Sequence, residues 1–137
     1  MFSIFIYFSV PKHNYILDIK NKTTIPPNKK RINNFNFYNN TFYVSTDYGI
    51  SVFYLDQLEF GDTFFIGNNA AYLNVSSTVI DEQFIYASCL SNGGIMMANL
   101  NQTLINYTNW SQIFSGSFDN LIKTESGVYF NDSRNIY

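Results

Sequence analysis

Five aspartates are the residues of this chain whose chemistry comes closest to that of a hydrolytic site. A glycosidase needs two carboxyl groups held at a fixed separation across the bond it cleaves. Most of these aspartates instead fall in predicted turns, where a carboxylate accepts local backbone hydrogen bonds. The sequence therefore predicts no catalytic pair among them: Asp47, Asp56, Asp62, Asp81 and Asp119.

Other reactive residues are too few to build a site. His13 is the only histidine, lies in a predicted turn and has no G-x-S-x-G sequence nearby. Gly93-Gly94 lacks the lysine and Ser/Thr that complete a phosphate-binding loop. Asp132 alone is too little for a calcium loop, and Cys89, the only cysteine, is expected to be a small buried apolar side chain. We expect no catalytic, cofactor-binding or metal-binding residue, and no enzyme.

The charge of the chain argues against nucleic-acid binding, and its aromatic residues are expected to be structural. The net charge is −2, whereas a nucleic-acid-binding protein usually carries a basic face. The one basic run, Lys29–Arg31, follows two prolines and is predicted to be a solvated loop. Trp110 is the only tryptophan; it could anchor a ligand, but packing between structural elements is the expected role. Phe and Tyr, 14 and 11 in number, favour strands over helices.

A recurring tetrad indicates which elements would position these residues. It reads IYFS at 6–9, FYVS at 42–45, IYAS at 85–88 and VYFN at 128–131. Its last three tyrosines, Tyr43, Tyr86 and Tyr129, are 43 residues apart, and Tyr7 precedes them by 36. A period in the low forties with a strand at its centre is typical of propeller blades. The tetrad is predicted to be the second strand of each blade.

The strands around each tetrad complete a four-stranded pattern. In the first full copy they are expected at Asn34–Phe37, Phe42–Val44, Ile50–Leu55 and Thr63–Ile66, and in the second at Val75–Ile80, Phe84–Cys89, Ile95–Leu100 and Trp110–Phe114. The second turn of the second copy is two residues longer, so Gly94 should correspond to Gly49. We predict an all-β, partial β-propeller of antiparallel blades in a single domain over 1–137. Its blades are expected at about 1–25 (partial), 32–67, 73–114 and 118–137 (incomplete).

About three blades are fewer than the four to eight that close a propeller, and a blade buries its faces only against neighbours. We therefore expect remaining blades of a longer chain, or self-association, to cover the open sheet faces. The apolar segment Met1–Val10 lacks a basic start and a cleavage site, so we interpret it as a strand, and no signal peptide is visible.

Several motifs together resemble one family. They are STDYGISVFYL at 45–55, DTFFIGNN at 62–69, FIYASCLSNGGIMMANLN at 84–101 and NWSQI at 109–113. Their order and spacing are similar to the N-terminal β-propeller of PorZ-type proteins of the type IX secretion system of Bacteroidetes. The turn between Cys89 and Gly94 is longer than the family's.

The resemblance implies a non-catalytic scaffold or binding module at the cell surface, associated with the outer membrane. It also implies membership of the attachment complex that includes the PorU-type sortase. That complex removes the secretion signal from cargo and links the cargo to anionic lipopolysaccharide. Lipopolysaccharide contact is associated with the family's C-terminal domain, and no site residue of the family transfers to this chain.

Two alternatives stay open at this point. Periplasmic sensor propellers of two-component regulators have short blade turns similar to residues 45–50. A propeller-fold lyase or glycosidase would need acids such as Asp47, Asp81 and Asp119 to meet at the central channel.

Overall fold

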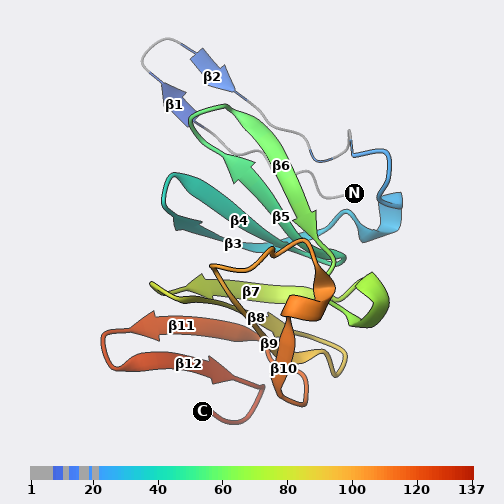
Figure 1. Cartoon of the computed structure of the whole chain (residues 1–137), viewed down its shortest axis with the longest axis vertical. Coiled ribbons are helices and arrows are strands. Elements are labelled where there is room, and N and C mark those ends of the chain that lie inside the picture. Colours follow the sequence, from blue (N-terminus) through green and yellow to red (C-terminus); the bar gives the residue numbers. More distant parts are fainter. Residues whose placement is uncertain (1–7, 11–12, 16–18, 20–21) are drawn as a thin grey trace.

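The computed structural model describes residues 8–10, 13–15, 19 and 22–137, so Tyr7 and Ile6 of the first tetrad lie outside the described residues. The described residues form strands joined by turns and by short 3-10 helices, among them η2 (Pro27–Lys29), η3 (Asn68–Ala70) and η4 (Tyr107–Asn109). The strands pair into antiparallel sheets of two and four members (Figure 1). The chain is a partial β-propeller, and the all-β prediction is confirmed.

The first sheet contains β3 (Ile32–Tyr38), β4 (Thr41–Thr46), β5 (Gly49–Tyr54) and β6 (Glu59–Phe64), in that order. Consecutive strands are neighbours because each connection is a tight turn. Asn39 and Asn40 both take positive φ, 45° and 59°, the backbone that a two-residue hairpin requires. A second tight turn, with Leu58 at φ 54°, starts β6 at Glu59.

The second sheet repeats this arrangement with β7 (Val75–Ile80), β8 (Phe84–Cys89), β9 (Gly94–Asn99) and β10 (Ser111–Phe114). A third hairpin follows, β11 (Asn120–Thr124) with β12 (Gly127–Asn131). Tyr43, Tyr86 and Tyr129 lie in β4, β8 and β12, the second strands of the three units, as the period predicts. At the N-terminal side β1 (Phe8–Val10) pairs with β2 (His13–Tyr15).

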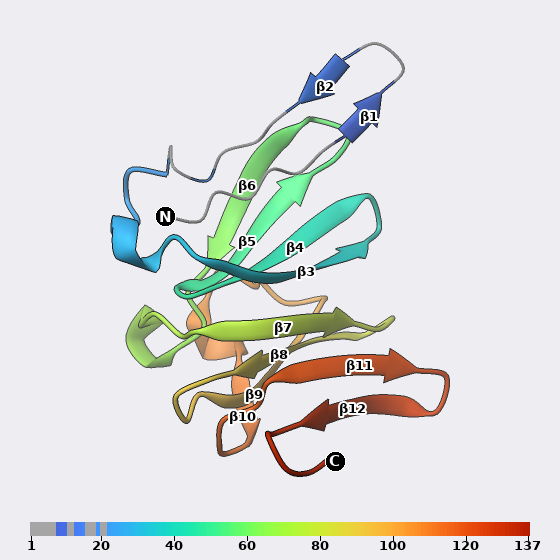
Figure 2. The ribbon, with the colours of Figure 1, turned by 180° about the vertical axis from the view of Figure 1, so that it is seen from behind.

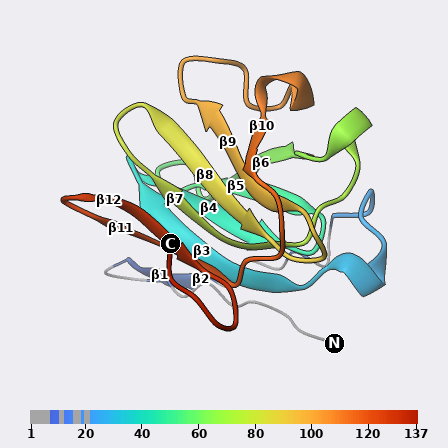
Figure 3. The ribbon, with the colours of Figure 1, turned by 90° about the horizontal axis from the view of Figure 1, so that it is seen from below.

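The units stack through their first strands. β7 contacts β3 on one side and β11 on the other, so these three strands succeed one another along the molecule (Figure 2). The long connection from β9 to β10, which carries η4, lies at the outer rim, away from β3 and β11 (Figure 3). We call the side of each sheet that points in the direction from the first sheet to the third hairpin its forward face.

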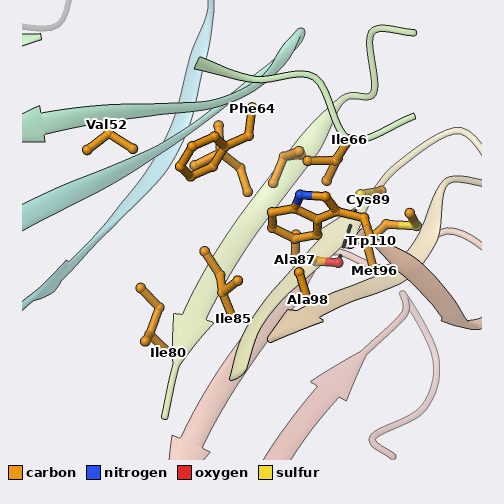
Figure 4. Packing of buried hydrophobic residues seen from close by; sticks show 12 residues of the cluster. Val52, Phe64, Ile66, Ile80, Ile85, Ala87, Cys89, Met96, Ala98 and Trp110 are labelled. Atoms are coloured by element: carbon orange, nitrogen blue, oxygen red, sulfur yellow. Dashed lines mark hydrogen bonds between the residues drawn. The ribbon is translucent and has the colours of Figure 1, made fainter. Parts of the chain in front are cut away.

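Apolar side chains fill the space between the first two sheets. The forward face of the first sheet contributes residues such as Ile50 and Phe64, and the second sheet contributes Ile85, Ala87 and Trp110 (Figure 4). The second sheet and the third hairpin share a smaller cluster of Val79, Ile95, Phe118, Leu121 and Phe130. Burial of these two clusters joins the three units.

Two glycines fix the start of the third strand in both sheets. Gly49 and Gly94 have φ of +142° and +76°, and a Cβ on either would lie against a backbone carbonyl, Phe64 O in the first sheet and Phe114 O in the second. Each carbonyl belongs to the last residue of the fourth strand. The predicted correspondence of Gly94 with Gly49 is therefore confirmed.

Two local predictions are wrong. The fourth strand of the first sheet runs over Glu59–Phe64 instead of Thr63–Ile66, because the tight turn at Leu58 brings Glu59 opposite Tyr54. Ile66 is buried in the core after the strand has ended. The turn expected to include His13 is shorter, since His13 already pairs with Val10 as the first residue of β2.

Candidate binding surfaces

The repeated tyrosine marks the forward face of each unit. Tyr43 pairs with Val52 on β5, and both line an open groove of about 270 Å³ between the first sheet and the β9–β10 connection. Tyr129 lines a cavity of about 320 Å³ on the forward face of the third hairpin. Tyr86 lies between them, beside the core that joins the second and third units.

The groove at Tyr43, which we call the tyrosine groove, has an aromatic and acidic wall. Tyr43 and Tyr54 line it, and Asp62 is exposed at its rim. Desolvation raises the pKa of Tyr43, and the neighbouring Tyr54 and Tyr38 hydroxyls add to the rise. The Tyr43 hydroxyl therefore stays protonated at neutral pH.

A glycine and a bulge in β6 determine how Tyr54 and Asp62 lie at the tyrosine groove. Gly61 lies directly under the ring of Tyr54, where a Cβ would overlap ring atoms Cε2 and Cζ. Gly61 and Asp62 lie in an irregularity of the β5–β6 ladder, between the Ser51 and Phe53 registers. Such bulges redirect side chains at sheet edges, and here Asp62 borders the groove that Tyr54 lines.

The opposite wall is the β9–β10 connection, which is fixed by its own hydrogen bonds. The Trp110 indole Nε1 donates to Leu104 O at 2.8 Å, and Asn109 Nδ2 donates to Thr103 O at 3.0 Å. Asn106 caps η4 by accepting from Thr108 N at 3.1 Å. Leu104 and Thr103 line the groove, so both of its walls are ordered.

A half-buried lysine lies on the other face of the first sheet. Lys22 Nζ donates to Thr63 Oγ1 at 2.7 Å and to Ser51 Oγ at 3.3 Å, and it stands 5.0 Å from the centre of the Phe60 ring. Desolvation lowers the pKa of Lys22, while the charge of Asp62 opposes that shift. This contact fixes the segment around Lys22 against β5 and β6.

A side-chain hydrogen bond recurs at each junction between units. Asn33 Nδ2 donates to Val75 O at 2.8 Å, and Ser76 Oγ donates to Phe118 O at 2.7 Å. The two donors, like the two acceptors, are 43 residues apart, so these are equivalent contacts in successive repeats. We call them the junction bonds.

The third hairpin presents an apolar forward face. Ile122, Tyr129 and Ile136 are 57%, 41% and 81% exposed beside the 320 Å³ cavity. The turn that borders it is organised by Asp132, whose Oδ1 accepts from the backbone N–H groups of Arg134 and Asn135, both at 2.7 Å. These bonds lower the pKa of Asp132.

Two of the aspartates considered for catalysis accept local hydrogen bonds. These two also lie at opposite edges of their sheets. Asp81 Oδ1 accepts from Phe84 N and Gln83 N in the β7–β8 turn, and Asp47 Oδ1 accepts from Asn33 Nδ2. Asp47 follows a second strand and Asp81 follows a first strand, so in antiparallel sheets they lie at opposite edges. Asp119 precedes β11, on the edge that Asp47 shares, and Asp56 is exposed in the β5–β6 turn.

The remaining candidates have structural surroundings. Trp110 is 6% exposed and its ring centre lies 6.3 Å from that of Phe64, which confirms packing between the sheets as its role. Burial raises the pKa of the Cys89 thiol to about 12. The residues that border the tyrosine groove were not singled out in the sequence, apart from Tyr43 as a repeat position and Asp62 among the aspartates considered for catalysis. The strand period offers no signal for Gln102 or Leu104, which reach the groove from a loop.

Within the described part of the chain, no three His, Cys, Asp or Glu residues gather as a metal site. The helices among the described residues are all too short or too polar to cross a membrane.

Comparison with known proteins gives one match. The family model described as the N-terminal β-propeller domain of PorZ, of the type IX secretion system, matches residues 11–111, well over half of the chain. No curated protein and no solved structure matches. The match favours neither the sensor propellers nor the lyases and glycosidases. With two four-stranded blades and a further hairpin stacked through their first strands, this chain belongs to the PorZ N-terminal β-propeller family.

Proposed function

We propose that this chain is a non-catalytic binding module of the type IX secretion attachment complex at the cell surface. In this role it holds protein partners, among them the PorU-type sortase, in a fixed position. The observation that carries the proposal is the family match over residues 11–111.

The geometry of the described residues supports a binding role. Two sheets share one apolar core, and the junction bonds join the first strands, so the surface belongs to one packed unit. Both the tyrosine groove and the apolar face at Tyr129 open on that unit. Clefts with aromatic linings and a few placed polar groups are the usual form of a recognition site.

The proposal is tested in the organism that encodes the chain. A strain that lacks the segment encoding residues 32–114 should secrete cargo that retains its secretion signal and is not attached to the surface. The PorU-type sortase should also co-purify with the tagged wild-type protein and not with the deletion. Normal cargo processing in the deletion strain would remove the attachment-complex role.

A further inference from the structure

We propose that the tyrosine groove binds a basic side chain, lysine or arginine, of a protein partner. This inference rests on the proposed binding function and gives the partner's chemistry. The groove of about 270 Å³ has room for one such side chain. The site would combine the rings of Tyr43 and Tyr54 with the carboxylate of Asp62.

The lining of the groove determines which charge a ligand should carry. Among the described residues that line it, Asp62 is the only charged one, and none is basic. Tyrosine rings attract cations to their faces. A carboxylate close to two rings therefore favours an ammonium or guanidinium group over an anion.

Lys22 does not occupy this position. Its Nζ donates to the hydroxyls of Ser51 and Thr63. These two residues lie on the face of the first sheet that carries Phe53 and Phe60, opposite to the face of Tyr43. The charge of Asp62 acts on Lys22 from a distance, as the upward contribution to the Lys22 pKa shows.

The next junction along the chain also places a repeat tyrosine, an acid and a basic side chain near one another. Tyr86 is the repeat equivalent of Tyr43, and desolvation together with the charge of the neighbouring Asp81 carboxylate raises its pKa. The Lys123 ammonium group acts on the same Asp81 carboxylate and donates to Ile80 O at 3.4 Å. A tyrosine, an acid and a basic side chain from the following unit thus meet at the second junction.

The first junction lacks the basic member of this set. The residue 43 positions before Lys123 is Ile80, which is buried in the core between the sheets. In the tyrosine groove the acid is Asp62, on the fourth strand, and the following unit supplies an isoleucine where the second junction has Lys123. A lysine or arginine of a partner would supply the basic group that the described lining of the groove does not contain.

The test uses the full chain and two side-chain mimics, n-butylammonium and n-butylguanidinium. Trp110 provides the signal because it is the only tryptophan and its indole N–H donates to Leu104 O, which borders the groove. We expect a saturable shift of the single indole N–H resonance, with a dissociation constant on the order of 1 mM, which corresponds to about −4 kcal/mol.

Variants separate the charge from the rings. Asp62→Asn should weaken binding of both mimics by about threefold to tenfold, and Tyr54→Leu by about threefold. The matched controls are Asp56→Asn, which removes an exposed carboxylate outside the groove, and Tyr72→Leu, which removes an exposed tyrosine outside the groove. Both controls should bind as the wild type does. Urea unfolding of each variant shows whether it is folded.

Several results would overturn the inference. They are an equal shift with n-butanol, saturation only with a methyl pyranoside, no saturation by either cation up to about 100 mM, and unchanged binding in folded Asp62→Asn. Sortase co-purification that persists in Asp62→Asn would contradict this inference and leave the proposed function intact. Binding of the mimics without any sortase co-purification would contradict only the proposed function.

Discussion

Replacing three glycines with alanine tests how closely the outer strands approach the third strands. Gly49, Gly94 and Gly127 all have φ in the positive region, at +142°, +76° and +151°. A Cβ at Gly49 would lie against Phe64 O and at Gly94 against Phe114 O, whereas at Gly127 nothing lies within 4 Å. Gly127→Ala is therefore a control that contains the backbone strain without the steric overlap.

The expected losses of unfolding free energy follow from these contacts. Backbone strain at such angles costs about 1–3 kcal/mol, and the stiffer unfolded chain returns about 0.4–1, so Gly127→Ala should lose about 1 kcal/mol. Gly49→Ala must also displace Phe64, which is 5% exposed, and ladder hydrogen bonds worth about 1 kcal/mol each. Its loss should reach about 3 kcal/mol. Gly94→Ala should lose about 2 kcal/mol, since Phe114 is 50% exposed and can move.

Urea unfolding followed by Trp110 fluorescence measures all three losses, because the indole packs beside Phe64. Total stability of a domain this size is about 5–15 kcal/mol, so a loss of 3 kcal/mol is a clear shift of the midpoint. A loss in Gly49→Ala no larger than that in Gly127→Ala, at unchanged urea dependence, would refute the close approach of β6.

Three further predictions concern single side chains. Trp110→Phe should lose about 2 kcal/mol because Leu104 O loses its donor, and it should speed hydrogen exchange of the Asn106 amide; unchanged exchange would contradict the role given to the indole. Burial raises the pKa of the Cys89 thiol from 9.0 to about 12. The stability that the neutral thiol contributes is therefore complete below pH 9 and is lost as the pH rises from 9 toward 12. The loss should reach up to about 1.4 kcal/mol per pH unit. Urea midpoints of the wild type and Cys89→Ala across this range measure the difference, and parallel curves would contradict it. The pKa of Asp132 is lowered, so its contribution is present above the unfolded pKa and is lost as the pH falls through the folded value. Exchange of the Asn135 amide should therefore quicken in acid and in Asp132→Ala at neutral pH, and an amide insensitive to both would contradict the turn.

The sequence predicted the parts of the fold that local periodicity controls. The tyrosine spacing located the second strands, and Gly94 was matched to Gly49 from the length of its turn; in the structure both start a strand beside a carbonyl. The fourth strand of the first sheet was predicted too late in the sequence, because the apolar run at 64–66 suggested a strand. In the structure Leu58 turns the chain earlier and Ile66 packs as core. The blade limits over 32–67 and 73–114 stay a prediction.

The tyrosine groove could not be predicted from local sequence patterns. Asp62 and Leu104 are about forty residues apart in sequence and border one groove only because the β9–β10 connection folds back over the first sheet. That path depends on Trp110 and its bond to Leu104 O, a tertiary contact that no period encodes. Tyr43 was noticed as a repeat position and Asp62 as one of the aspartates, and neither was predicted to be a binding residue.

The junction bonds have a consequence for how such repeats diverge. Their acceptors, Val75 O and Phe118 O, belong to the main chain and survive any substitution, while the donors are an amide in Asn33 and a hydroxyl in Ser76. Any short polar side chain that carries a hydrogen can fill the donor position. Copies of a blade can thus drift far apart in sequence and still dock on one another, which leaves spacing, more than residue identity, as the trace of their common origin.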